Sequence, residues 1–227
     1  MNLLKMLLFF SFFLSPLFGK DKGLSKTTYV YRRDIKGKCS TTTWTVEKKE
    51  KNLSIQGVSE GGNTRVTTSL PLNTRSFSYQ SKTRANAYYI DRNGPCLIAK
   101  RVENGHVTQK KFNIGNDFWI QEFDFSMRDF ILSKAHSLKF YTVHPTRLSL
   151  HYMIAIKSNS IDRVKIGDRS HDALRVKITL IGIKKMMWKA DLWFDPKTGD
   201  LLKYAANEGP NTPTSVISLF SKTMHKT

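Results

Sequence analysis

The chain has 227 residues, of which 37 are Lys or Arg and 18 are Asp or Glu, so its formal net charge is +19. This length is enough for one β-rich domain with a substantial core. In a cytosolic protein such a charge would favour a nucleic-acid partner. The N-terminal segment predicts export, which excludes nucleic acid and leaves the anionic surfaces of a cell envelope as candidate partners.

Residues 1–19 are typical of a secretory signal peptide. Lys5 carries the only positive charge of the segment, an apolar stretch follows, and Pro16 lies shortly before the end. The uncharged run over residues 6–19 is shorter than the roughly 20 residues that a membrane-spanning helix needs. We therefore expect export, to the periplasm first and to a secreted or membrane-associated location as the alternative, with residues 20–227 as one antiparallel β domain.

Strands are predicted through most of this domain. Apolar and polar residues alternate over residues 148–156, 174–180 and 186–194, which is the pattern of strands with one buried and one solvated face. Turn residues separate eight earlier segments that are also predicted to be strands. Those segments are 27–33, 41–47, 52–58, 64–69, 75–80, 86–91, 96–102 and 107–113.

The chain contains two cysteines, Cys39 and Cys96. In an oxidising compartment they could form a disulfide, and the alternative is two free thiols. Neither belongs to a Cys-x-x-Cys motif, so the sequence predicts no thiol redox site and no zinc site. We expect no cofactor.

One short helix is predicted near residues 126–134, where Ser126 can act as the N-cap and Asp129 follows three residues later. Aromatic residues gather just before it. They are expected to fill the core or, alternatively, to line an apolar groove for a ligand. The candidate residues for that apolar face are Phe118, Trp119, Phe123, Phe125 and Trp188.

Catalytic motifs are absent from the sequence. Glu122 and Asp124 are two residues apart on an expected strand edge, and such neighbours do not define the cleft that paired carboxylates need. His171 lies in an acidic turn that we interpret as solvated. We therefore predict no catalytic or metal-binding residue. The segment after Phe220 is expected to be frayed.

The segment 188–204 contains a strand that ends in Trp193-Phe194-Asp195, a turn with Gly199, and a returning strand. It resembles the final hairpin of exported bacterial proteins of unknown function and, more distantly, the lipoprotein-carrier group typified by LolA and LolB. The specific resemblance covers about residues 188–213. It implies a curved antiparallel sheet, wrapped like an unclosed barrel around helices, with an apolar concave face.

These observations predict a mainly β fold, a strongly curved antiparallel half-barrel packed on one short helix. The first functional hypothesis is a non-catalytic envelope protein that binds an apolar or lipid-like ligand in the curved sheet. The second is an envelope interaction or structural protein that uses its basic surface on anionic glycolipid or cell wall. The third is a hydrolase with an unrecognised site.

Overall fold

The computed structural model describes residues 25–49, 51–69, 73–182, 188–207 and 213–225. The strands of the N-terminal half are β1 (Ser25–Ile35), β2 (Lys38–Lys49), β3 (Asn52–Ser59), β4 (Gly62–Ser69), β5 (Asn73–Ser81), β6 (Asn86–Asn93), β7 (Cys96–Glu103) and β8 (His106–Asn113). Two short helices follow, α1 (Phe123–Ser126) and α2 (Arg128–Leu132). The strands of the C-terminal half are β9 (Ser137–His144), β10 (Ser149–Ile166), β11 (Arg169–Leu180), β12 (Lys189–Phe194), β13 (Leu201–Asn207) and β14 (Thr214–His225).

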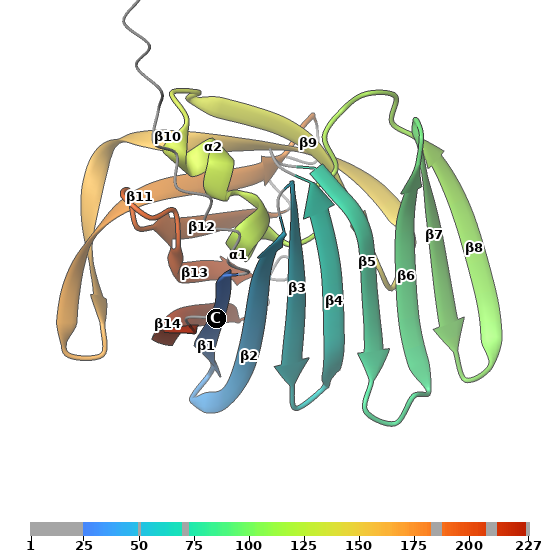
Figure 1. The fold of residues 1–227 in the computed structure, drawn as a ribbon, viewed down its shortest axis with the longest axis horizontal. Coiled ribbons are helices and arrows are strands. Elements are labelled where there is room, and N and C mark those ends of the chain that lie inside the picture. Colours follow the sequence, from blue (N-terminus) through green and yellow to red (C-terminus); the bar gives the residue numbers. More distant parts are fainter. Residues whose placement is uncertain (1–24, 50, 70–72, 183–187, 208–212, 226–227) are drawn as a thin grey trace, which may run out of the picture.

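The described strands form one antiparallel sheet in the order β8-β7-β6-β5-β4-β3-β2-β1-β14-β13-β12-β11-β10-β9. The first and last strands of the chain, β1 and β14, pair in the middle of the sheet, and β8 and β9 form its two edges. Figure 1 shows the sheet curving around α1 and α2 without closing into a barrel. The predicted fold, a curved antiparallel half-barrel packed on a short helical segment, is confirmed.

All eight strands predicted between residues 27 and 113 are present. The alternating segments over 174–180 and 186–194 correspond to β11 and β12, of which residues 186 and 187 lie outside the described ranges. The predicted signal segment, residues 1–19, also lies outside them.

The buried face of β10 differs from the prediction. The alternation suggested that Ile154 and Ile156 face the core, whereas Met153 and Ala155 are the buried pair, and Ile156 is 39% exposed. In the ladder with β11, Ala155 lies opposite Ile178, whose side chain is fully buried on the concave face. Both faces of β10 carry apolar residues, so the period-two pattern alone could not say which face the rest of the sheet would cover.

The helical segment predicted near 126–134 is present, but it begins earlier and is divided at Met127. Glu122, rather than Ser126, is the N-cap of α1, and its carboxylate accepts hydrogen bonds from two backbone N–H groups. The Ser126 side chain is buried at the end of α1 instead. The sequence pattern indicates a strand edge at Glu122 and does not identify this residue as a cap; Phe125, three residues later, is buried against the sheet.

The end of the described chain is a strand, so the frayed tail expected after Phe220 is wrong. In the β1–β14 ladder, Thr28 lies opposite Thr223 and Lys26 opposite His225. The exposed, polar composition of this segment resembles a loose tail. Its hydrogen-bond partners come from the other end of the chain, which local sequence does not reveal.

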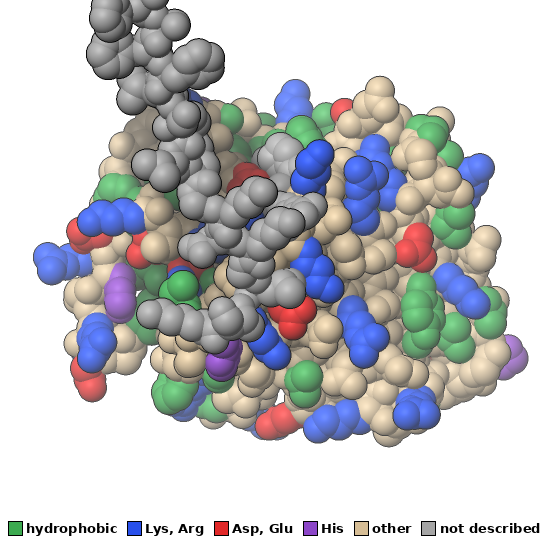
Figure 2. Space-filling model, viewed as in Figure 1, with side chains coloured by type: hydrophobic (Ala, Val, Ile, Leu, Met, Phe, Trp, Pro, Cys, Tyr) green, Lys and Arg blue, Asp and Glu red, His purple; other side chains and the backbone are tan. Residues whose placement is uncertain are grey.

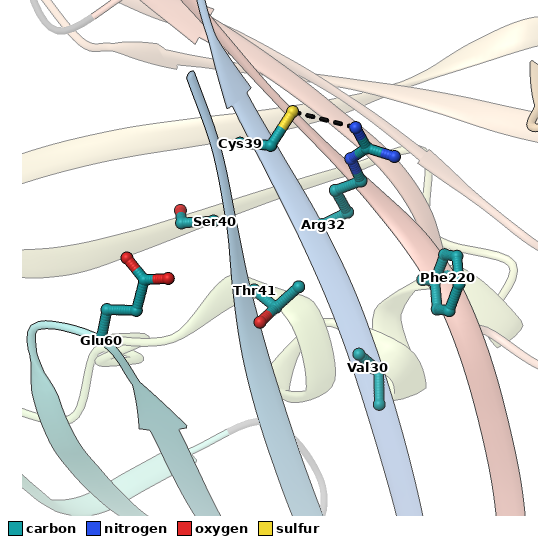
Figure 3. A pocket seen from close by; sticks show the side chains of 7 residues that line it. All are labelled: Val30, Arg32, Cys39, Ser40, Thr41, Glu60 and Phe220. Carbon is teal, nitrogen blue, oxygen red and sulfur yellow. Dashed lines mark hydrogen bonds between the residues drawn. The ribbon is translucent and has the colours of Figure 1, made fainter. Parts of the chain in front are cut away.

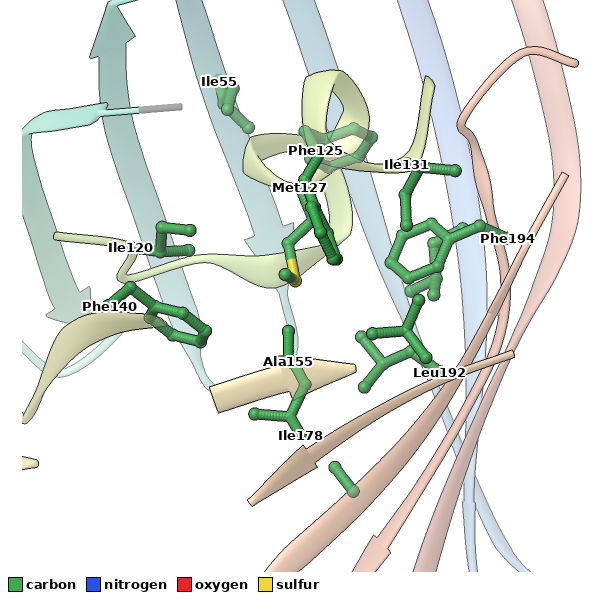
Figure 4. Close-up of a cluster of buried hydrophobic side chains, with 14 of the residues drawn as sticks. Ile55, Ile120, Phe125, Met127, Ile131, Phe140, Ala155, Ile178, Leu192 and Phe194 are labelled. Carbon is green, nitrogen blue, oxygen red and sulfur yellow. The ribbon is translucent and has the colours of Figure 1, made fainter. Parts of the chain in front are cut away.

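Apolar side chains from one face of the sheet and from the two helices form a cluster that we call the concave core, part of which is shown in Figure 4. The buried members of the concave core are Tyr29, Tyr31, Val46, Leu53, Ile55, Val66, Ile120, Phe125, Met127, Phe130, Ile131, Phe140, Met153, Ala155, Val176, Ile178, Ala190, Leu192, Phe194, Leu201 and Ala206.

The segment that joins β8 to α1 crosses over to the opposite edge of the sheet. The Tyr141 backbone N–H on β9 donates to the Phe118 carbonyl (2.8 Å), and the Ile120 N–H donates to the Tyr141 carbonyl (3.0 Å). On its other side, the Trp119 carbonyl accepts a hydrogen bond from the Thr74 N–H of β5 (2.9 Å). This segment therefore covers part of the β9 edge and ties it to β5.

Candidate functional site

The helices α1 and α2 fill the concave face of the sheet. Phe125, Met127, Phe130 and Ile131 are each at most 6% exposed. Figure 4 shows Phe125, Met127 and Ile131 pointing into the concave core, toward the strands that surround them. Full burial of one such side chain contributes about 1.5–3 kcal/mol, so the four together contribute roughly 6–12 kcal/mol.

Phe125 sits among aromatic rings from the first two strands. Its ring centroid lies 5.0 Å from that of Tyr29 and 5.8 Å from that of Trp44. The Trp44 indole lies over Gly57 of β3, where a Cβ atom would come within 2.5 Å of the ring. Glycine at position 57 therefore leaves space for the Trp44 indole, which in turn contacts Phe125 of α1.

The five aromatic residues of the predicted apolar face divide between two places. Phe123, Phe125 and Trp188 belong to the concave core or pack directly against it. Trp119 is fully buried in a second cluster beside β6 and β7, and Phe118 is 37% exposed. The structure therefore brings three of the five together on the concave face.

Two carboxylates and one hydroxyl lie close to these apolar side chains. Burial, and to a lesser degree the neighbouring Asp124 carboxylate, raises the pKa of Glu122 well above its ordinary value. Burial likewise raises the pKa of Asp124 from 3.8 to about 7. Within the described part of the chain, neither acid has a Lys or Arg at ion-pair distance, and the buried Ser126 Oγ has no hydrogen-bond partner.

A third acid, Asp200, is compensated by contrast. Its carboxylate is 7% exposed and accepts hydrogen bonds from the Tyr29 hydroxyl (3.0 Å), the Thr198 hydroxyl (2.7 Å) and the Lys222 ammonium (2.6 Å). Burial alone would raise the pKa of Asp200, but these hydrogen bonds outweigh it and lower the pKa. The Arg128 guanidinium lies 4.0 Å away, so the same carboxylate anchors the start of α2 to the sheet.

Lys157 anchors the other end of α2. Its Nζ donates to the carbonyls of Ile131 (3.1 Å) and Ser133 (2.8 Å), which have no partner within the helix, and lies 4.6 Å from the centre of the Phe130 ring. Desolvation lowers the pKa of this buried amine. Lys157 follows the alternating segment 148–156 directly and lies where the β10–β11 register shifts.

On the opposite face of the sheet, a shallow depression crosses β14, β1 and β2 (Figure 3). Phe220, which occupies an irregularity in the β1–β14 register, is 71% exposed there. The Arg32 guanidinium donates a hydrogen bond to the Cys39 sulfur (3.0 Å). The lining residues are Val30, Arg32, Cys39, Ser40, Thr41, Glu60 and Phe220.

Both cysteines are free thiols in the structure, so the disulfide that the sequence left open is not formed. Cys39 lies at the start of β2 and Cys96 at the start of β7, with four strands between them in the sheet. Neighbouring strands are about 4.8 Å apart, which puts five spacings at roughly 24 Å along the sheet. A disulfide requires Cα atoms within about 7 Å of each other.

Lys and Arg side chains are dispersed over the face shown in Figure 2 and outnumber the acids there. They do not gather into one block. In the residues that the structure describes, no group of three or more His, Cys, Asp or Glu side chains could hold a metal ion. No helix in these ranges is long and apolar enough to cross a membrane.

No family model and no curated protein matches this chain. Solved structures do match. A β-barrel-like protein of the domain of unknown function DUF1849, from Brucella abortus, aligns over 89% of this chain and 98% of its own length, with a TM-score of 0.50 and 6% identity. These two proteins share a fold. The half-barrel implied by the sequence resemblance is thereby confirmed as an architecture.

Two further matches are more distant. The hypothetical lipoprotein YmcC from Escherichia coli aligns over 86% of both chains, with a TM-score of 0.36 and 10% identity. A LolA superfamily protein from Nitrosomonas europaea covers 89% of this chain and 86% of its own, with a TM-score of 0.25 and 8% identity.

Three residues of the site were not singled out by the sequence. Tyr29 and Asp200 are 171 positions apart, and Lys157 and Ile131 are 26 apart, so no local pattern connects them. The sequence places Asp200 directly after Gly199 in a turn. Polar residues are common in turns, so this position did not indicate that Asp200 would be buried. Asp200 becomes a buried anchor because β1 and β14, which pair with each other, bring Tyr29 and Lys222 to its carboxylate.

Proposed function

We propose that this chain is an exported, non-catalytic envelope protein that binds an apolar or lipid-like ligand on its concave face. In this proposal, α1 and α2 cover the binding surface in the absence of ligand and move aside when the ligand enters. The fold supports the proposal because a curved, unclosed sheet presents a continuous apolar face. The signal-like segment over residues 1–19 supports export.

The observation that carries the proposal concerns α1 and α2, which we call the helical cover: it combines buried apolar side chains with polar groups that are poorly compensated. Its apolar side chains are well packed, yet it brings the Asp124 carboxylate and the Ser126 hydroxyl into a poorly compensated setting. A buried polar group without a partner costs about 1–3 kcal/mol. Moving the cover into solvent would recover that cost for the Ser126 hydroxyl and would rehydrate the Asp124 carboxylate.

The ligand must then replace the apolar contacts that the cover gives up. Each buried methylene contributes about 0.8 kcal/mol, so an acyl chain of roughly twelve carbons would contribute about 10 kcal/mol. This is within the roughly 6–12 kcal/mol supplied by the four helical side chains. A long acyl chain is therefore the class of ligand that matches the surface, whereas a small polar metabolite could not offset the loss.

Trp44 offers a direct test because its indole contacts Phe125 of the cover. Titration with a lysophospholipid below its micellar concentration should give a saturable change in tryptophan emission. The change should be strongly reduced in Trp44→Phe, with a remainder from Trp188, which also packs against the concave core. It should be kept in the matched variant Trp193→Phe, whose indole N–H donates to Asp162 away from the concave core. Absence of a saturable change, together with no lipid in mass spectra of the natively purified protein, would contradict the proposal.

The filled concave core favours a second candidate function. If α1 and α2 never leave, the protein acts through its outer surface, and the net charge of +19 then suits an anionic glycolipid or cell-wall polymer. This candidate predicts binding that weakens with ionic strength, whereas acyl-chain binding in the concave core would be nearly independent of it.

A further inference from the structure

The two edges of the sheet are treated differently. The β9 edge is partly covered by Phe118 and Ile120, which exchange backbone hydrogen bonds with Tyr141. The β8 edge has no such cover from the described residues, and Figure 1 shows β8 as the outermost strand of its half. Seven of the eight residues of β8 are exposed. Its register with β7 runs from His106 to Asn113 without a bulge.

The register also identifies which backbone groups are free. The two-residue turn at Asn104 and Gly105, both with positive φ, makes the flanking pair Glu103 and His106 a hydrogen-bonded pair. Hydrogen-bonded and non-hydrogen-bonded pairs alternate along an antiparallel ladder. The N–H and C=O groups of every second residue of β8, namely Val107, Gln109, Lys111 and Asn113, therefore point away from β7. They form a row of donors and acceptors open to a further strand.

Positive charge surrounds this row. In the hairpin made of β7 and β8, four side chains are cationic and one is a carboxylate. The carboxylate, Glu103, is already within 3.6 Å of the Arg101 guanidinium. The cations lie on both faces of the hairpin, because Lys110 and Lys111 are consecutive residues of a strand. A strand added at this edge would have positive charge on either side.

We propose that β8 is a docking edge for an extended acidic segment of a partner protein, which adds to the sheet as a further strand. Backbone hydrogen bonds supply the register of such an interaction, and the side chains supply its selectivity. Charge complementarity selects an acidic partner. A second copy of this chain is disfavoured, because pairing of two β8 edges would bring together two hairpins that each carry an excess of Lys and Arg.

Lysines at a sheet edge also protect a protein from aggregation. That role and docking are compatible, since the same charges repel an uncharged or basic strand and attract an acidic one. The two interpretations differ in one measurable respect: protection alone predicts no saturable binding of an acidic extended peptide. The proposed lipid site lies on the concave core and is not needed for this inference, so either can fail without the other.

The test uses the full-length protein and a fluorescent synthetic peptide as long as β8, in which Glu alternates with Val. We expect saturable binding by fluorescence anisotropy that weakens at least about tenfold in the double variant Lys110→Glu/Lys111→Glu. Gln109→Pro should weaken it similarly, because it removes an outward N–H that the fold does not use. The matched charge control is Lys48→Glu/Lys49→Glu, which makes the same change on β2, an internal strand of the sheet. This variant should bind the peptide as the native protein does.

The peptide itself provides an arm that does not depend on how the variants fold. Methylation of its alternate backbone nitrogens removes donors but keeps its charge, so binding should again fall about tenfold or more. The proposal is overturned if the native protein does not bind the peptide, or if N-methylation leaves binding unchanged. It is also overturned if sedimentation shows a dimer of the native chain that the Gln109→Pro substitution dissociates, since the edge would then belong to a second copy.

Discussion

At the scale of single residues, two partly or fully desolvated acids, Asp200 and Asp124, have opposite pKa shifts because their partners differ. Asp200 receives hydrogen bonds from Tyr29, Thr198 and Lys222, and its pKa is lowered. Asp124 is near apolar side chains of the helical cover, and its pKa is raised to about 7. Burial is common to both, so the presence of a nearby ammonium and hydroxyls decides the outcome.

The raised pKa of Asp124 predicts a specific pH dependence of stability. Between about pH 4 and pH 7 the unfolded chain loses the Asp124 proton while the folded chain keeps it, so the folded state becomes less stable as pH rises and levels off above pH 7. Asp124→Asn removes this loss. We expect the variant to exceed the native protein by about 2 kcal/mol at pH 8 and to differ little at pH 4, by urea unfolding.

Asp168→Asn is the matched control, because Asp168 is exposed in the β10–β11 turn. It should leave the free energy of unfolding unchanged at both pH values. If Asp124→Asn were no more stable than the native protein at pH 8, the Asp124 carboxylate would have to be compensated in the folded state. The proposal that the helical cover holds poorly compensated polar groups would then lose its main support.

At the scale of elements, α1 and α2 of the helical cover depend on contacts with the sheet for their stability. The helices have four and five residues, whereas isolated helices shorter than about 12 residues are marginal in water. Arg128 and Lys157 hold the two ends of α2, and the concave core holds its apolar face. The proposed function requires this element to leave the sheet as a unit when a ligand replaces its apolar contacts.

The last strand makes an element-scale prediction. A chain that stops at Phe220 loses the pairing of β14 with residues 26–30 of β1 and the Lys222 ammonium that neutralises Asp200. We expect its free energy of unfolding to fall by about 3 kcal/mol, measured by urea unfolding. Lys222→Met keeps the strand and removes only the charge, so its loss should be smaller. If the truncated and native chains had equal free energies of unfolding, the segment after Phe220 would contribute nothing to stability, as expected of a frayed tail.

At the scale of the whole molecule, the sheet runs as a meander from β8 to β1 and from β14 to β9, joined at its centre by the two ends of the chain. Its inner face is filled by α1 and α2, and the molecular surface shown in Figure 2 carries dispersed cations. Interior and exterior therefore suit different partners. The proposed apolar ligand would contact the interior, and the anionic surface of the second candidate function would contact the exterior.

The net charge of +19 predicts how the outer surface behaves. The protein should sediment with vesicles that contain anionic phospholipid at low ionic strength, and binding should fall at least about tenfold between roughly 0.05 M and 0.3 M salt. Neutral vesicles of the same size are the control and should not bind. Binding that is equally strong in high salt would exclude an electrostatic surface interaction and leave apolar contact as its origin.

Much of the fold could be predicted because the strand signal is local. Alternation over 174–180 and the turn residues between the early strands are properties of short segments, and the structure contains those strands. The same pattern failed for β10, where both faces are apolar and Lys157 lies inside. It failed for β14, whose partner strand lies at the other end of the chain.

The amino-acid sequence by itself determined the β character, the positions of most strands, the helical segment after the aromatic run, and the basic charge. Side-chain periodicity and turn chemistry act over a few residues, so they can be recognised without a structure. Strand order, the inner face of β10, the Asp200 anchor and the free edge at β8 were decided only by the tertiary structure. Each of them depends on hydrogen bonds and contacts between residues far apart in the chain, and no local pattern encodes which distant strand will be the neighbour.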